Sequence, residues 1–115
     1  MSELVDHTVE MFGPLGPVQA RRMFGGYGLF RGEAMFGILV DGVLFLKADE
    51  ITTPLFKARG LTRFQYDRNG RPVRMSFFAA PEEVFDDRDE AELWGRRALE
   101  AAERARAMRG GRRSR

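Results

Sequence analysis

The sequence predicts an α+β domain of two layers, in which an antiparallel sheet of about five strands is flanked by N-terminal, middle and C-terminal helices. Apolar residues recur at helical spacing near both ends of the chain, over residues 3–12 and 91–105. The dipeptides Asp41-Gly42 and Asn69-Gly70 separate short apolar runs. Such dipeptides favour two-residue hairpins, because both central residues of a type I′ turn need positive φ. Hairpins imply antiparallel pairing, and helices gathered around one sheet imply an α+β arrangement.

The strands are predicted from short apolar and alternating runs between turn residues. They cover residues 27–31, 34–40, 43–48, 63–68 and 72–78, and a further extended piece is expected near residues 19–24. In the last strand, the alternation predicts that Val73, Met75 and Phe77 point inward and that Arg74 and Ser76 point outward.

The helix boundaries are predicted from capping residues. Asp49 or Thr53 is expected to cap the middle helix, with Pro54 in its first turn and Gly60 just past its end. The last helix is expected to end near Met108, where two glycines follow. These limits predict one domain over residues 1–108 and a disordered, arginine-rich tail over residues 109–115.

The composition excludes several classes of protein. The 115-residue chain has no cysteine, which excludes disulfides, thiolate nucleophiles and cysteine-ligated metals. Its first residues show no signal-peptide pattern, and no apolar run approaches the ~18 residues of a membrane span. We therefore expect a cytoplasmic protein without a membrane partner.

The charge is distributed unevenly along the chain. The net charge is +2, yet residues 104–115 hold six arginines and no acid, which leaves 13 basic and 17 acidic residues in the remainder. Residues 1–103 are therefore mildly acidic, and they lack the broad positive charge of a nucleic-acid-binding domain. Non-specific contacts with nucleic acid are expected only from the tail, at Arg109, Arg112, Arg113 and Arg115.

No catalytic, cofactor or metal site is predicted. The one histidine, His7, has acidic neighbours on a helix that is expected to be solvated, and Ser76 lies in a strand without a nucleophile motif. The acidic residues between 82 and 90 do not have the spacing of a calcium loop. The glycine-rich run at residues 25–32 begins a dinucleotide fingerprint, but Arg31 stands where the third glycine is required.

The glycine run is therefore interpreted as a sharp turn into a strand, and its surroundings as a surface for a partner. Lys47 can bind an anion at the end of its strand or pair with the neighbouring Asp49 in solvent. The candidate partner-binding residues are Arg21, Arg22, Met23, Phe24, Tyr27 and Lys47.

Four blocks of the sequence resemble a known family. They are RMFGGYGL at residues 22–29, MFGILVDGVLFLKADE at 35–50, FQYDRNGRPVRMSFFAAPEE at 64–83 and DEAELWGRRALEAA at 89–102. In this order they resemble the TfoX/Sxy N-terminal domain, from regulators of bacterial competence. The resemblance implies a fold similar to secretion chaperones and no catalytic residues. In two-domain members it implies coactivation of DNA-uptake genes together with a cyclic-AMP receptor-type regulator.

The residues and the resemblance together predict a non-enzymatic protein-interaction module, a stand-alone N-terminal domain acting as an accessory regulator of transcription or competence. Two alternatives stay open. One is nucleic-acid binding through the arginine tail, and the other is a small-molecule sensor with a pocket between the sheet and the last helix, near Trp94. A homodimer is also considered, because a single sheet with few helices leaves apolar area exposed.

Overall fold

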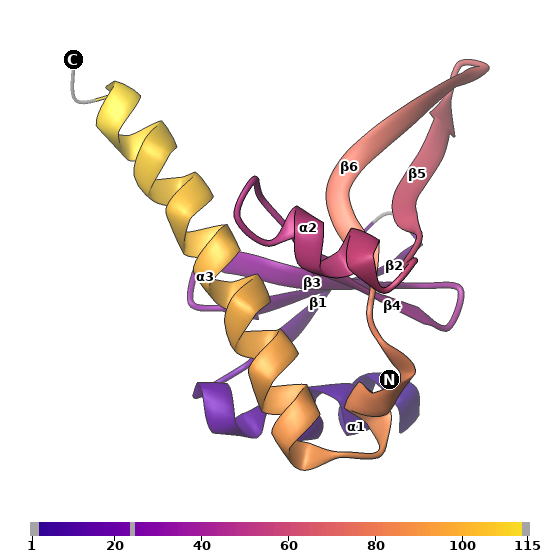
Figure 1. The fold of residues 1–115 in the computed structure, drawn as a ribbon, viewed down its shortest axis with the longest axis vertical. Helices are drawn as coiled ribbons and strands as arrows, with labels where there is room; N and C mark the ends of the chain where they lie inside the picture. Colours follow the sequence, from indigo (N-terminus) through magenta and orange to yellow (C-terminus); the bar gives the residue numbers. More distant parts are fainter. Residues whose placement is uncertain (1–2, 24, 114–115) are drawn as a thin grey trace.

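Six strands form one antiparallel sheet that carries its helices on one face (Figure 1). A computed structural model describes residues 3–23 and 25–113. The strands are β1 (Gln19–Met23), β2 (Gly26–Arg31), β3 (Ala34–Val40), β4 (Val43–Lys47), β5 (Arg63–Arg68) and β6 (Arg71–Ala79). The helices are α1 (Glu3–Met11), α2 (Thr53–Ala58) and α3 (Arg88–Arg113), with short 3-10 turns η1 (Gly13–Leu15) and η2 (Glu82–Phe85).

The predicted fold class is confirmed, and the sheet has one strand more than expected. The strand order is β1-β2-β3-β4-β6-β5, with antiparallel pairs throughout. The additional strand is β1, the extended piece expected near residues 19–24. Both predicted hairpin turns have positive φ at their two central residues, at 51° and 77° for Asp41 and Gly42 and at 53° and 78° for Asn69 and Gly70.

A core rich in aromatic rings joins the helices to the sheet. The ring of Phe12 meets Phe36 of β3 edge-on, and Phe56 of α2 stacks on Phe78 of β6. α3 lies close to this core because residue 95 is glycine. A Cβ there would come within 2.8 Å of the Phe12 ring. Among the described residues, no helix is both long and apolar enough to cross a bilayer.

The direction of the side chains on β6 was predicted wrongly. Phe78 belongs to the core beneath the helices, because it pairs with the buried Leu46 of β4. Val73, Met75 and Phe77 do share one face, as their alternation predicted, but it is the face turned away from the helices. The MSFF run places an apolar residue on each face, so its pattern alone could not distinguish the two sides.

The end of α3 was also predicted wrongly. The helix continues through Gly110-Gly111 to Arg113, whereas the glycines were expected to stop it near Met108. Glycine inside a helix costs only about 1 kcal/mol relative to alanine, so two glycines disfavour a helix without forbidding it. The C-terminal half of α3 extends past the sheet (Figure 1).

Candidate partner-binding surfaces

The sheet face turned away from the helices has a largely apolar centre, with Arg21 and Lys47 also on it, and we call it the apolar face. Its side chains alternate along each strand with those that enter the core. They are Met23, Phe30, Met35, Ile38, Val40, Phe45, Phe64, Tyr66, Val73, Met75 and Phe77. A sheet with one face against helices normally turns polar side chains to solvent on the other. This face departs from that pattern.

The apolar face is hollowed into a cavity of about 330 Å³. It is lined by Met23, Tyr27, Met35, Ile38, Val40, Phe64, Tyr66 and Met75. These residues come from β1, β2 and β3 and from the far pair β5 and β6, so the two ends of the sheet curve toward each other. Irregular register between β2 and β3 and between β5 and β6 accompanies the curvature, as bulges do. The volume lies at the lower limit of ligand pockets.

Two glycines of β2 allow the strands to approach closely here. A Cβ on Gly28 would lie 2.6 Å from Sδ of Met23 and 2.9 Å from Sδ of Met35. A Cβ on Gly26 would lie 2.2 Å from the carbonyl oxygen of Leu39. The glycine-rich run therefore serves sheet packing, and a strand rather than a helix N-terminus follows it. This confirms the interpretation of the run as a turn into a strand.

Two cations lie over aromatic rings of the apolar face. The guanidinium carbon of Arg21 is 4.2 Å from the centre of the Phe30 ring, and Nζ of Lys47 is 5.2 Å from that of Phe77. Both distances fit cation–π contacts. Burial lowers the pKa of Lys47, the charge of Arg109 lowers it further, and Asp49 opposes the shift. The apolar face thus carries positive charge beside its apolar centre.

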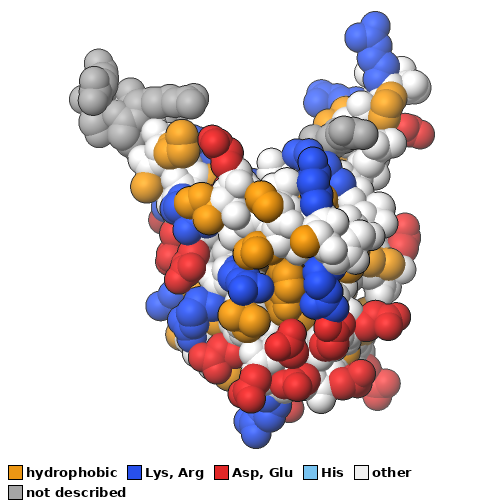
Figure 2. All heavy atoms as spheres, viewed as in Figure 1, with side chains coloured by type: hydrophobic (Ala, Val, Ile, Leu, Met, Phe, Trp, Pro, Cys, Tyr) orange, Lys and Arg blue, Asp and Glu red, His pale blue; other side chains and the backbone are white. Residues whose placement is uncertain are grey.

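A second hollow, which we call the basic groove, lies between α2, the C-terminal half of α3 and the β5–β6 hairpin. Figure 2 shows a notch at the end of the molecule from which the β5–β6 hairpin projects. The groove encloses about 810 Å³. Its lining is Lys47, Ala48, Asp49, Glu50, Thr53, Pro54, Lys57, Ala58, Arg63, Ser76 and Ala105.

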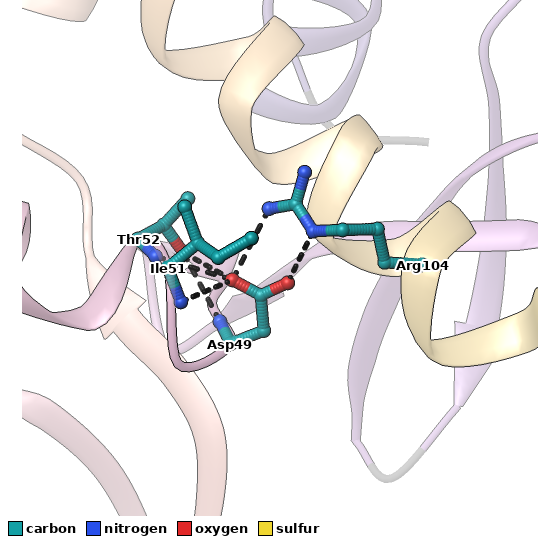
Figure 3. Close-up of polar contacts among 4 residues, drawn as sticks. All are labelled: Asp49, Ile51, Thr52 and Arg104. Atoms are coloured by element: carbon teal, nitrogen blue, oxygen red, sulfur yellow. Dashed lines mark hydrogen bonds and ion pairs between the residues drawn. The ribbon is translucent and has the colours of Figure 1, made fainter. Parts of the chain in front are cut away.

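Asp49, which lines the groove, accepts hydrogen bonds from Arg104 of α3 (Figure 3). Its Oδ1 accepts hydrogen bonds from the backbone N–H groups of Ile51 and Thr52. Arg104 donates from Nε to Oδ2 at 2.6 Å and from Nη2 to Oδ1 at 3.2 Å. The Arg104 hydrogen bond is the largest of the effects that lower the pKa of Asp49. The N-cap residue of α2 is Thr52, not Asp49 or Thr53 as expected.

Comparison with known proteins places this architecture in a family. Residues 10–102 match the model of the TfoX N-terminal domain. The chain belongs to the TfoX N-terminal domain family. It is also similar to DNA transformation protein TfoX1 of Aliivibrio fischeri (strain ATCC 700601 / ES114), at 30% identity over 82 residues. That similarity covers 71% of this chain and 39% of the relative, so the chain spans about two fifths of the relative's length.

The candidate residues of this TfoX N-terminal domain lie partly together. Arg21 and Met23 of β1 share the apolar face with Lys47 of β4, and Tyr27 lines the cavity. Arg22 stands opposite Tyr27 across β1 and β2, with its guanidinium 6.0 Å from the ring centre. Phe24 is outside the described residues.

Sequence reasoning missed the part of the apolar face that comes from the second half of the chain. Phe64, Tyr66 and Met75 line the cavity, yet none was a candidate. Their alternation with polar residues was the available signal, and for Met75 it was interpreted as pointing inward.

The tail residues proposed to contact nucleic acid lie largely within α3. Arg109 is exposed on that helix, and Arg112 and Arg113 continue its backbone. Arg115 is outside the described residues.

The sensor pocket expected near Trp94 is filled by protein. Trp94 is only 3% exposed, and its ring centre lies 5.0 Å from that of Phe56. The apolar cavity lies on the opposite side of the sheet, so the expected location was wrong.

Proposed function

We propose that this TfoX N-terminal domain is a non-enzymatic module that binds a protein of the transcription machinery through its apolar face. The observation that carries the proposal is the cavity on a sheet face that the chain's own helices leave uncovered. Contiguous exposed apolar surface on a soluble domain marks an interaction site. A partner is therefore expected to insert an apolar side chain into the cavity.

The side chains of the apolar face suit a protein partner. Three of the eight lining residues are methionines, Met23, Met35 and Met75. Methionine adapts its shape to the side chain it meets, which is why it is common on peptide-binding surfaces. Tyr66 is 39% exposed at the cavity and adds the type of aromatic anchor that carries binding energy in interfaces. Arg21 and Lys47 favour acidic residues next to the partner's apolar anchor.

The role in competence is proposed from the family and from the relative. TfoX1 of Aliivibrio fischeri carries the name of a DNA transformation protein, and this chain matches 39% of it. We propose that the present domain is an accessory regulator of the same kind, acting in the cytoplasm, where transcription takes place.

The proposal is tested by capturing partners of the tagged protein from nuclease-treated lysate of the source organism. Tyr66→Glu places a charge on the apolar face, and Leu93→Glu makes the same change on α3 at a leucine that is 43% exposed. We expect a transcription regulator or polymerase subunit to be held by the wild type and by Leu93→Glu, but not by Tyr66→Glu.

If the wild type, Leu93→Glu and Tyr66→Glu all hold the partner equally, the apolar face is not the binding site. Turnover of a substrate that is abolished by substitution of Lys47 would contradict a non-enzymatic role.

A further inference from the structure

Charge is segregated between the two ends of the molecule, although the net charge is small. Residues 57–76 hold six basic residues and one acid, and residues 104–115 hold six arginines and no acid. Residues 82–92, between them in sequence, hold seven acids and one arginine. Acidic side chains gather at the end of the molecule opposite the notch (Figure 2). One end of the molecule is therefore basic, although residues 1–103 are mildly acidic as a whole.

The stretch at residues 57–76 and the C-terminal half of α3 lie on opposite sides of the basic groove. The β5–β6 hairpin rises on one side of it and the C-terminal half of α3 on the other (Figure 1). Arg63 lines the groove from the hairpin, Lys57 from α2 and Lys47 from the end of β4. These residues are far apart in sequence, so the groove exists only in the folded chain.

Three cations and two carboxylates, those of Asp49 and Glu50, line the groove. Among the described residues, neither Lys47, Lys57 nor Arg63 forms an ion pair. The carboxylate of Asp49 is bound by Arg104 of α3 through two hydrogen bonds, so Arg104 offsets one of the two negative charges of the lining. Crowding of like charge is also visible at Lys47, whose pKa is lowered by burial and then by Arg109. An anion placed in the groove would relieve this repulsion.

We infer that the basic groove binds the phosphate backbone of duplex nucleic acid, with Lys47, Lys57 and Arg63 contacting phosphates. Several cations spaced along an open groove suit a repeating polyanion better than a single small anion. None of the described residues that line the groove is aromatic, so they supply no platform for stacking unpaired bases. Contacts to phosphates alone carry no sequence information, and the binding is therefore sequence-independent.

This inference shares only Lys47 with the proposed protein interaction, because Lys57 and Arg63 do not belong to the apolar face. Lys47 lies at the border, with its side chain over Phe77 on the apolar face and part of the residue in the groove lining. Nucleic acid and a protein partner could then be bound by different sides of one domain.

The test measures binding to a short fluorescein-labelled DNA duplex of mixed sequence by fluorescence anisotropy. Lys47→Gln/Lys57→Gln removes two charges from the groove, and Arg88→Gln/Arg96→Gln removes two exposed charges from the N-terminal half of α3. We expect the groove variant to bind about tenfold more weakly, with a salt slope smaller by about one for each phosphate that is no longer neutralised. The α3 variant should bind nearly as the wild type does.

Two further variants keep the test decisive. Lys57→Gln alone changes an exposed residue of α2 and should weaken binding even if the double variant unfolds, which circular dichroism would reveal. A chain ending at Met108 lacks the arginine tail and should keep groove-dependent binding.

The inference is overturned if the wild type does not bind the duplex, if both double variants bind equally, or if only the truncation at Met108 abolishes binding. Preference for single strands, or displacement by a mononucleotide as readily as by the duplex, would also overturn it. Tyr66→Glu should bind DNA as the wild type does, which separates this outcome from that of the partner capture.

Discussion

At the scale of single residues, Gly26 and Gly28 show how a missing side chain permits a close approach. Both lie inside β2, where glycine normally weakens a strand. Gly26 lets its backbone approach the Leu39 carbonyl, and Gly28 leaves room for the sulfur atoms of Met23 and Met35. The first approach involves rigid backbone and the second flexible side chains, so the two positions should tolerate substitution differently.

Gly26→Ala should destabilise the fold by about 1–3 kcal/mol, because its Cβ would clash with the backbone oxygen of Leu39. Urea unfolding followed by circular dichroism measures the loss of stability. Gly13→Ala is the matched control, since a Cβ at residue 13 meets nothing within 4 Å. Equal unfolding midpoints for the two variants would contradict this account of Gly26.

Asp49→Asn should lower the free energy of unfolding by about 1–2 kcal/mol at neutral pH, because it removes the charge-assisted bonds from Arg104. The pKa of Asp49 is lowered in the folded protein, so its contribution is full above the unfolded-state pKa of about 3.9. That contribution disappears as the pH falls through the lower, folded-state pKa.

Chemical unfolding of wild type and Asp49→Asn across this range measures the difference, which should shrink toward acid. Asp67→Asn, at an exposed position of β5, is the control for removing a carboxylate. A difference that stays constant from neutral to strongly acid pH would show that the charge of Asp49 contributes nothing.

At the scale of elements, α3 has two parts with different roles. Its first part packs on the sheet through residues such as Trp94, Ala98 and Ala102, which are nearly fully buried. Residues 106–109 of the helix are exposed, and Ala105 lines the basic groove. The first part of α3 therefore stabilises the fold, and the part that follows contributes to the surface of the groove.

Removing residues 109–115 should leave the thermal midpoint nearly unchanged, because the buried length of α3 and Arg104 both remain. Removing residues 104–115 should lower it by several degrees, since the bonds between Arg104 and Asp49 go with it. Thermal unfolding by circular dichroism compares the two chains. Equal decreases would mean that the last helical turns stabilise the fold directly.

At the scale of the whole molecule, two surfaces of opposite character share one small domain. The apolar face should associate by burial of apolar area, and the basic groove by electrostatic attraction. The homodimer stays a prediction. In a face-to-face pair, Arg21 and Lys47 of both copies would lie near one another and repel, which should keep self-association weak.

Salt should therefore affect the two surfaces in opposite directions. Added sodium chloride screens the repulsion between two apolar faces and should strengthen self-association, as sedimentation equilibrium would measure. The same salt should weaken binding of a DNA duplex to the basic groove. Self-association that salt weakens, or that Tyr66→Glu leaves intact, would place the interface elsewhere.

Local patterns in the sequence were enough to predict the elements, the turns and the family. Helical and alternating periodicity and the positive-φ dipeptides Asp41-Gly42 and Asn69-Gly70 are local properties, and the strands formed where they predicted. The tertiary structure alone decided which side of the sheet Val73, Met75 and Phe77 occupy, because alternation defines two faces without saying which one the helices cover. It also decided that Lys57 and Arg63 meet α3 across a groove. A net charge summed along the chain cannot show such a meeting, because electrostatic potential depends on where the fold places each charge.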